Sequence, residues 1–442
     1  MNVPPGPRGL PGVGSLIEYQ KDPLGFLRRL SQDYGPISSF YVGPSPVYLV
    51  SDPELIGEVL LTNHSVMHKD EIYQGLKRFL GEGLVTSEDD VWKRHRKIAA
   101  KPFGKKQVDK YAEEMVALTS GWLQDQTDGA VVDIGHSMSH LTQSIVLRCL
   151  FGTDIQADTE RAGNCIQEYL DGYVKELFGV QRLIPNWVPT PGRRRADQLT
   201  REMDEIIFEV VAAKRAQRDA GDDVLSRLLA AAEGEGGMSD KQLRDEAVTF
   251  YAAGHETTAT MLTYVYYELS RHPDMQRRLY DEVAEVLQGQ APAAGDLGRL
   301  PYTQAVIREA MRVHPPIWAI GREPVTETVI GGYTVRPGTQ LMVSTYVMHH
   351  KAEWFPEPDE FRPERWLDGL YDRLPRFVYL PFGGGPRICI GNHFAMLEST
   401  MMIARIAQQF SFEATSDRVI NPVPSITLRP DFPVELTLRA IS

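Results

Sequence analysis

Cysteine is scarce in this chain, with only Cys149, Cys165 and Cys389 among 442 residues. An odd and sparse count does not suit a disulfide framework, so we expect a reducing compartment, the cytoplasm. Positive charge is also in deficit, since 47 Lys and Arg face 59 Asp and Glu for a net charge of −12. A nucleic-acid partner is not expected, because phosphate binding needs clustered cations.

Long apolar runs are missing as well. No window approaches about 18 uninterrupted apolar residues, so no transmembrane helix is predicted. The start, MNVPPGPRGLPGVG, lacks the charged and apolar regions of a signal peptide. We therefore expect a protein without a membrane anchor, of ordinary globular composition with 42% apolar and 24% charged residues.

The pattern along the chain is mainly helical. Residues 1–20 are predicted to form an extended Pro/Gly arm, followed by a short helix over 22–35 and a hairpin around Gly43-Pro44. From about 52 to 290 the apolar spacing of three and four indicates helices. Strands and turns are expected over 325–350, a helix over 392–410, and a strand–turn–strand over 426–439. The fold class is mainly α with a smaller β region, in one continuous unit.

One predicted helix is unusually long. Ser239 and Gln242 form a capping-box pattern, and nothing interrupts the helical spacing before Pro273. About 33 residues at 1.5 Å each span roughly 50 Å, enough to cross the whole core. Inside it, Gly254 lowers helix stability, and the Thr257–Thr258 pair can bond back to carbonyls and bend the helix.

The third cysteine lies in PFGGGPRICIG, residues 381–391. The loop lacks the lysine of a Walker phosphate loop, and Ile388 stands where a dinucleotide fingerprint needs a glycine. A following helix favours a thiolate at Cys389, and glycines let backbone N–H groups approach the sulfur. One His four residues on, His393, makes only half a zinc site. A lone thiolate suits an iron whose other equatorial ligands come from a porphyrin.

This loop carries a resemblance to a known family. Phe382, Gly385, Arg387, Cys389 and Gly391 match F-x-x-G-x-R-x-C-x-G at every fixed position, and the loop resembles the haem-binding loop of cytochrome P450 enzymes. The resemblance runs from PPGPRG to ITLRP. It implies a single domain over 1–442 with the triangular-prism fold of that family. Haem b would be buried between the long helix and the loop, with Cys389 as the metal ligand.

The resemblance also implies roles for two further motifs. In AAGHETTA, Ala253 and Gly254 would leave room for dioxygen, and Glu256 and Thr257 would form the acid–alcohol pair that delivers protons. In EAMR, Glu309 and Arg312 alone would predict a surface pair of little stability. The resemblance instead implies a buried structural network that includes Arg365 of FRPERW.

The segment VWKRHRK would, by itself, be a solvated basic helix. The resemblance implies that Trp92 and Arg96 bond the haem propionates, helped by Arg322 and Arg387, with His95 a weaker candidate on another helix face. It also implies that an acidic electron donor, a ferredoxin or flavodoxin served by its own reductase, docks on this basic surface. Its remaining cations are Lys93, Arg94, Lys97, Lys101, Lys105 and Lys106.

The resemblance implies a soluble bacterial monooxygenase with a eukaryote-like body, monomeric, that inserts one oxygen atom of O2 into a hydrophobic small molecule. A fatty acid, a terpenoid and a polyketide-like substrate all fit. The expected pocket residues are Phe79, Phe250, Ala253, Thr258, Ile317, Trp318 and Ile320.

Three alternatives remain open: a peroxygenase of the same fold, an isomerase or dehydratase without external electrons, and a haem protein that only binds gas or ligand. Glu256 and Thr257 argue against the first and third, and less strongly against the second.

Overall fold

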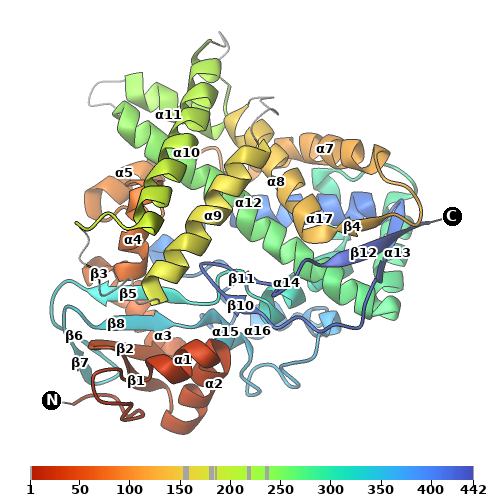
Figure 1. Ribbon diagram of the computed structural model, residues 1–442. Helices are drawn as coiled ribbons and strands as arrows, with labels where there is room; N and C mark the ends of the chain where they lie inside the picture. Colours follow the sequence, from red (N-terminus) through yellow and green to blue (C-terminus); the bar gives the residue numbers. More distant parts are fainter. Residues whose placement is uncertain are drawn as a thin grey trace. The chain divides into compact units, whose positions relative to one another are not determined.

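The computed structural model of the chain describes residues 2–152, 159–178, 184, 187–216, 221–233 and 238–441. Its contacts fall into two compact units. The first comprises Met1–Leu76, Met311–Phe361 and Gly369–Cys389, and the second comprises Lys77–Ala310, Arg362–Asp368 and Ile390–Ser442. The structure is mostly helical with a smaller sheet region, which confirms the predicted fold class (Figure 1).

A five-stranded sheet organises the first unit. The predicted hairpin is confirmed: β1 (Ile37–Val42) and β2 (Ser45–Val50) pair antiparallel. β2 then pairs parallel with β8 (Gln340–Val343), and β8 pairs antiparallel with β5 (Ile320–Pro324), which reaches β3 (Met67–His68). Apolar residues of these strands gather into one buried core cluster.

The other elements of the first unit are short. They are α1 (Leu16–Lys21), α2 (Pro23–Tyr34), α3 (Pro53–Gly57), η1 (Glu58–Thr62), η2 (His64–Val66), β6 (Thr328–Ile330), β7 (Tyr333–Val335), α15 (Thr345–His349), α16 (Leu370–Arg373) and η7 (Gly385–Arg387). The helix α4 (Glu71–Leu80) begins in this unit.

The predicted extended arm over 1–20 is wrong from Leu16 onward, because α1 begins there. Tyr19 on α1 is buried, with its ring 5.7 Å from that of Phe40 and 6.0 Å from that of Phe26. Burying this aromatic ring outweighs the weak helix signal that the Pro/Gly-rich surroundings carry. Residues before α1 are held along β1, where Gly14 bridges to Val42.

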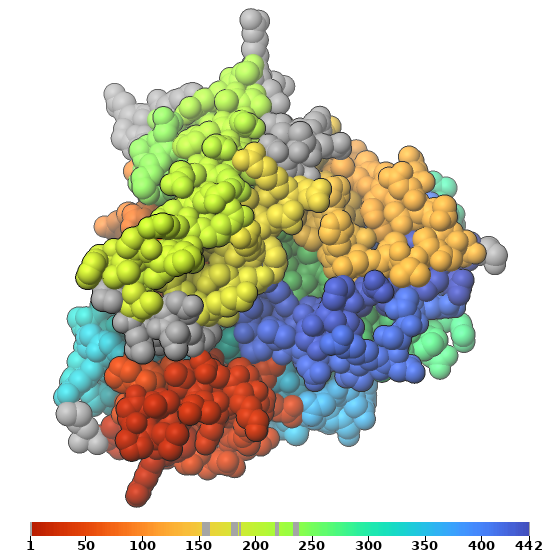
Figure 2. Space-filling view, viewed as in Figure 1, coloured from red at the N-terminus to blue at the C-terminus, as the bar shows by residue number. Residues whose placement is uncertain are grey.

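Helices make up most of the second unit. They are α5 (Asp89–Ala99), α6 (Lys105–Val108), η3 (Asp109–Tyr111), α7 (Ala112–Gln124), α8 (Ile134–Phe151), α9 (Thr159–Phe178), α10 (Pro191–Ala216), α11 (Val224–Glu233), α12 (Asp240–Arg271), α13 (Pro273–Leu287), η5 (Ala294–Arg299), α14 (Pro301–Val313), η6 (Pro363–Trp366) and α17 (Asn392–Ile406), of which α14 continues beyond the unit. α9 and α10 pack against each other and form a ridge on the viewed face (Figure 2).

The long predicted helix is confirmed as α12, of 32 residues. Ser239 caps its N-terminus and forms the capping box with Gln242, and the helix ends just before Pro273. Most of its residues are buried, and it packs along α8. A helix this long stays ordered because tertiary packing, more than intrinsic propensity, stabilises it.

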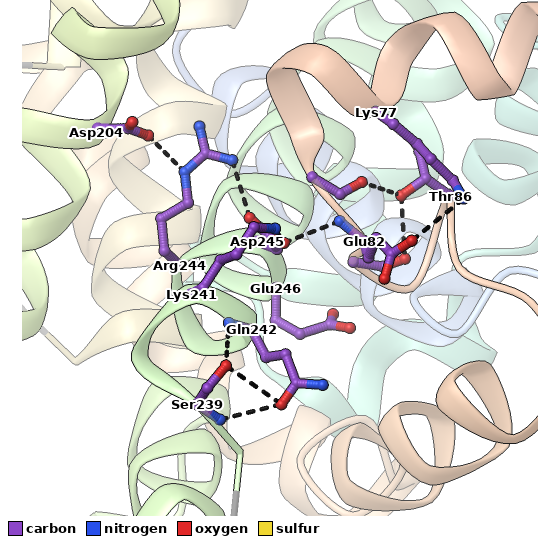
Figure 3. A network of polar contacts seen from close by, with 12 residues as sticks. Lys77, Glu82, Thr86, Asp204, Ser239, Lys241, Gln242, Arg244, Asp245 and Glu246 are labelled. Atoms are coloured by element: carbon purple, nitrogen blue, oxygen red, sulfur yellow. Dashed lines mark hydrogen bonds and ion pairs between the residues drawn. The ribbon is translucent and has the colours of Figure 1, made fainter.

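A polar network anchors the first turns of α12 (Figure 3). The buried carboxylate of Asp245 accepts bonds from the Glu82 amide at 2.9 Å, from Lys241 Nζ at 2.7 Å and from Arg244 Nη1 at 3.1 Å. Arg244 also bonds Asp204 on α10. The network fixes the start of α12 against α10 and the loop after α4.

Small sheets complete the second unit. β12 (Glu435–Ala440) lies between β4 (Val131–Asp133) and β9 (Phe410–Ala414), and β10 (Val423–Pro424) pairs with β11 (Leu428–Arg429). The strands predicted over 426–439 therefore exist, but they pair with other strands and not with each other. Among the described residues, no helix combines the length and apolar character needed to cross a bilayer.

Candidate functional site

The cysteine loop in the first unit is closed by backbone hydrogen bonds. The Cys389 amide donates to the Phe382 carbonyl at 2.9 Å, and the Ile388 amide donates to the Gly385 carbonyl at 3.2 Å. Gly385 has φ +67°, and a Cβ there would lie 1.9 Å from the Leu60 carbonyl oxygen. Only glycine fits that position, because the loop lies directly against the backbone of η1.

The residues of the loop differ in exposure. Cys389 is exposed, Phe382, Arg387 and Gly391 are half-buried, and Gly391 is the N-cap of α17. No cluster of three or more His, Cys, Asp or Glu suited to a metal occurs in the described part of the chain. A single thiolate donor in a tight backbone turn fits an iron that takes its other equatorial ligands from a porphyrin.

Arg322, a predicted propionate partner, lies buried on β5 and bonds the Gly321 carbonyl with Nη1 at 2.7 Å. It faces a carboxylate that the sequence did not single out. Asp70 accepts the amides of Ile72 and Tyr73 at the start of α4, and burial raises its pKa to about 6 although Arg322 opposes the shift. A buried aspartate beside an arginine is a tertiary pairing that sequence spacing does not reveal.

Trp92 and Arg96, in the second unit, lie half-buried one turn apart on α5, as the spacing predicts. His95 is different: it is buried, and its Nδ1 lies 2.6 Å from Oε1 of Glu246 on α12. Within the described ranges its other ring nitrogen has no hydrogen-bond partner. The contact that the structure assigns to His95 therefore joins two helices, and its predicted role toward a cofactor stays a prediction.

The basic surface continues past α5. Lys93, Arg94, Lys97, Lys101, Lys105 and Lys106 are all exposed. Lys101, Lys105 and Lys106 line a shallow hollow together with Lys110, which the sequence prediction did not include. A cluster of exposed cations on an otherwise acidic protein favours a negatively charged partner at that surface.

The AAGHETTA segment lies in the middle of α12. Thr257 Oγ1 donates to the Ala253 carbonyl at 2.8 Å, and Thr258 Oγ1 donates to that of Gly254 at 3.3 Å, so both hydroxyls bond back within the helix. Gly254 passes close to α8, where a Cβ would lie 3.0 Å from Val146 Cγ2. Ala253 is exposed, although most of α12 is buried.

Glu256 has partners that the sequence did not indicate. Thr427 Oγ1 donates to its Oε1 at 2.8 Å, and Arg429 donates to the same oxygen from Nε at 3.2 Å and from Nη2. Arg429 Nη1 also bonds Asp171 on α9 at 2.7 Å. About 170 residues separate Thr427 and Arg429 from Glu256, so no local pattern could have linked them.

Glu309 is fully buried in the second unit and well supplied with donors. Its oxygens accept bonds from Arg365 Nε at 2.9 Å, from the Arg362 amide at 2.8 Å and from Trp366 Nε1 at 2.8 Å. Arg312, in the first unit, donates to the carbonyls of His349, Pro358 and Glu360.

Glu398 on α17 is a buried acid that the sequence reading missed. In the ranges that the structure describes, neither of its oxygens has a hydrogen-bond partner. Burial raises its pKa well above the usual value, and the nearby Thr258 hydroxyl offsets this only in part. An acidic residue on a helix face is normally read as solvated, so only burial marks it.

The predicted pocket residues lie in different settings. In the second unit Phe79 stacks on Tyr169 at 4.3 Å, Phe250 stacks on Phe103 at 5.6 Å, and Thr258 is buried. In the first unit Ile317 and Ile320 pack with the core cluster, and the buried Trp318 accepts bonds at its carbonyl from Ser344 and Tyr346. Their contact with a substrate stays a prediction.

Comparison with known proteins identifies the same family that the motif of the cysteine loop indicates. The cytochrome P450 family matches residues 4–436. Cyclooctatin synthase of Streptomyces melanosporofaciens is 35% identical over 431 residues, which covers 96% of this chain and 92% of that protein. Cyclooctat-9-en-7-ol 5-monooxygenase of the same organism is 33% identical over 425 residues, covering 96% and 90%.

Pentalenene oxygenase of Streptomyces avermitilis is 30% identical over 437 residues, which covers 98% of this chain and 96% of that protein. These matches include both the cysteine loop and the AAGHETTA segment. The chain therefore belongs to the cytochrome P450 family, whose members depend on a haem, and it is a monooxygenase of that family.

Proposed function

We propose that this enzyme binds haem b through Cys389 and inserts one oxygen atom of O2 into a terpenoid. The observation that carries the proposal is the position of Cys389 in a loop that is closed by its own amide and tightened by Gly385. The terpenoid class is supported by the relatives named for cyclooctat-9-en-7-ol and pentalenene, which are hydrophobic terpenoids.

Several side chains would hold the cofactor. Cys389 would donate its thiolate to the iron, and the residues proposed to bond the propionates are Trp92, Arg96, Arg322 and Arg387, with His95 kept as a weaker candidate. Phe382 and Gly391 would shape the loop. The haem supplies the activation of dioxygen when bound. We keep the prediction of one domain over 1–442, supported by a family match that runs through both units.

Proton delivery would fall to Glu256 and Thr257. The Thr257 hydroxyl hydrogen is used in the bond to Ala253, which leaves the oxygen able to accept a bond from water. Glu256 is largely but not fully buried, which suits a carboxylate that takes protons from solvent and passes them inward. Ala253 and Gly254, which carry little or no side chain, would leave space on this stretch of α12.

Monooxygenases of this family need a redox partner and a hydrophobic substrate. We propose a ferredoxin or flavodoxin with its reductase, because the cations on α5, α6 and the loop between them suit an acidic protein. We also keep the cytoplasm and a monomeric state as proposals, the first supported by the sparse cysteine count.

The test of the site is spectroscopic. The reduced carbon monoxide complex should show the Soret band of thiolate-ligated haem, and Cys389→Ser should lose it. Cys165→Ser is the matched control, since Cys165 lies in α9. Retention of the band in Cys389→Ser would overturn the assigned ligand.

The substrate is tested by spectral titration with terpenoid alcohols and hydrocarbons beside fatty acids and polyketides, followed by mass spectrometry of products made with NAD(P)H, reductase and donor. Oxygenated terpenoid products are expected. Products from fatty acids alone would overturn the terpenoid class. Turnover with peroxide only, or none with any oxidant, would favour one of the alternative activities.

The donor surface is tested by Lys97→Glu and Lys105→Glu. Each should slow reduction by ferredoxin or flavodoxin at low salt, and the difference should shrink at high salt as charges are screened. Lys175→Glu, on the exposed side of α9, is the control. Unchanged rates in both variants would overturn the docking proposal.

A further inference from the structure

One arginine, Arg429 on β11, is shared between two carboxylates of the second unit. It bonds Glu256 on α12 with Nε and Nη2, and it bonds Asp171 on α9 with Nη1. The side chains of Arg429 and Glu256 are 15% and 14% exposed, whereas that of Asp171 is 45% exposed. The Glu256 contact is therefore shielded from water and strong, while the Asp171 contact is at the surface and weaker.

The bonds to Glu256 all converge on one oxygen. Oε1 accepts from Arg429 Nε at 3.2 Å, from Arg429 Nη2 and from Thr427 Oγ1 at 2.8 Å. In the part of the chain that the structure describes, Oε2 accepts no hydrogen bond from a protein group. A carboxylate held by one oxygen has a fixed orientation, and its second oxygen keeps lone pairs for water.

The planar guanidinium group of Arg429 restricts the geometry of its contact with Glu256. Its five N–H donors lie in one plane, so bonds to Glu256 on one side and to Asp171 on the other restrict that plane. Arg429 Nε also lies 3.2 Å from Thr427 Oγ1, and the Thr427 side chain is buried beside it. Arg429 on β11 and Thr427, directly before that strand, thus act on the same oxygen.

We propose that Arg429 is a positioning residue for proton delivery: with Thr427 it holds Glu256 by Oε1, so that Oε2 is the oxygen that exchanges protons with water. Asp171 steadies the guanidinium from the surface side. This inference rests on the proposed role of Glu256 as the proton-delivering acid. It assigns to strand β11 a part in the reaction that the motif on α12 does not contain.

The experiment compares Arg429→Gln, Arg429→Lys, Thr427→Val and Asp171→Asn with the full-length wild-type enzyme. Arg439→Gln is the matched control, because Arg439 makes an exposed ion pair with Glu413 at 2.8 Å on another strand. Two readouts are taken: product formed per NAD(P)H consumed, and the infrared carboxylate band of Glu256, assigned by its loss in Glu256→Gln. The band reports hydrogen bonding to the carboxylate directly and needs no turnover.

In Arg429→Gln we expect product per NAD(P)H to fall about tenfold, part of the roughly 10²–10⁴-fold effect of a positioned acid. The Glu256 band should shift. Arg429→Lys should recover part of both readouts because it keeps one charged donor, and Thr427→Val should shift the band less. Asp171→Asn should have the smallest effect, and Arg439→Gln none.

The two proposals fail in different ways. If Glu256→Gln lowers product yield but Arg429→Gln and Thr427→Val leave both yield and band as in the wild type, the positioning role is overturned alone. If Glu256→Gln itself keeps full yield, the proposed role of Glu256 fails first. Should Arg429→Gln not fold, Arg429→Lys and Thr427→Val decide the question by the same two readouts.

Discussion

Two fully buried glutamates of the same unit have opposite surroundings. Glu309, on α14, accepts bonds from an arginine side chain, a backbone amide and an indole of residues 362–366. Glu398, on α17, has no hydrogen-bond partner for either oxygen within the described ranges. Both are 0% exposed, so the two glutamates differ in their hydrogen-bond donors and not in their burial. Donors offset the free-energy cost of burying a polar or charged group.

Burial changes the pKa of Glu398 and that of a neighbouring thiol. Burial raises the pKa of Glu398 well above its usual range. Burial also raises the pKa of the Cys149 thiol on α8, with Glu398 as the second cause. The neutral, carboxylic acid form is therefore the one that suits this interior, whereas Glu309 is organised for an ion pair with Arg365. Substituting each of the two glutamates should therefore change the free energy of unfolding in a different way.

The largest effect is expected from Glu309→Gln. The change leaves the guanidinium of Arg365, only 6% exposed, without its carboxylate, and losing one partner of a buried pair costs about 3–5 kcal/mol. The free energy of unfolding from urea titration measures it. Asp274→Asn, which breaks an exposed pair with Arg277, is the control and should change stability by less than about 1 kcal/mol. A loss for Glu309→Gln as small as the control would contradict the comparison.

Asp70 is an intermediate case, buried but bonded by two amides. Its pKa is raised from 3.8 to about 6, so between these values the unfolded chain has released a proton that the folded chain keeps. The stability of the wild type relative to Asp70→Asn should fall as pH rises from about 4 to 6, by at most about 3 kcal/mol, and stay level above that.

Urea unfolding at several pH values measures the Asp70 trend. Asp52→Asn is the control, because Asp52 also accepts two backbone amides at a helix start, those of Glu54 and Leu55 on α3. Comparing the two variants separates the effect of lost capping from the effect of burial. A relative stability that rises with pH through this window would show that Asp70 is ionised more readily in the folded chain, against the expectation.

Glu398→Gln tests the buried glutamate that has no hydrogen-bond donors within the described ranges. The amide has the shape of the neutral acid, so little changes at low pH. Above the usual pKa of a glutamate the unfolded chain releases this proton while the folded wild type keeps it, so the variant should gain stability on the wild type as pH rises, by at most about 1.4 kcal/mol per pH unit. Equal slopes of stability against pH in the two proteins would indicate that Glu398 is charged.

The smallest effect is expected from Thr258→Val. The hydroxyl bonds the Gly254 carbonyl at 3.3 Å and is near Glu398, so its loss should cost about 1 kcal/mol or less and extend the pH dependence caused by Glu398 to higher pH. Thr119→Val is the matched control, a buried threonine that bonds Met115 in the same way on α7. If both variants alter the pH dependence equally, Thr258 has no particular link to Glu398.

The sequence predicted the elements whose signals are local. The capping box of Ser239 and Gln242, the uninterrupted apolar spacing up to Pro273 and the turn at Gly43 all act within a few residues. The glycine loop around Cys389 is local in the same sense, and the chemistry of a lone thiolate followed from its composition. The helix α1 was missed because the buried ring of Tyr19, not the surrounding sequence, accounts for it.

By itself the sequence determined the class of fold, because helix and strand signals depend on neighbouring residue types and backbone preference. It also predicted the cysteine ligand from the composition of the loop, and the acid–alcohol pair through the resemblance to the family. Only the tertiary structure decided which carboxylates have partners: Arg429 for Glu256, residues 362–366 for Glu309 and none for Glu398 within the described ranges. A hydrogen bond depends on distance in space, and strands or helices more than fifty residues apart meet only after the core has packed.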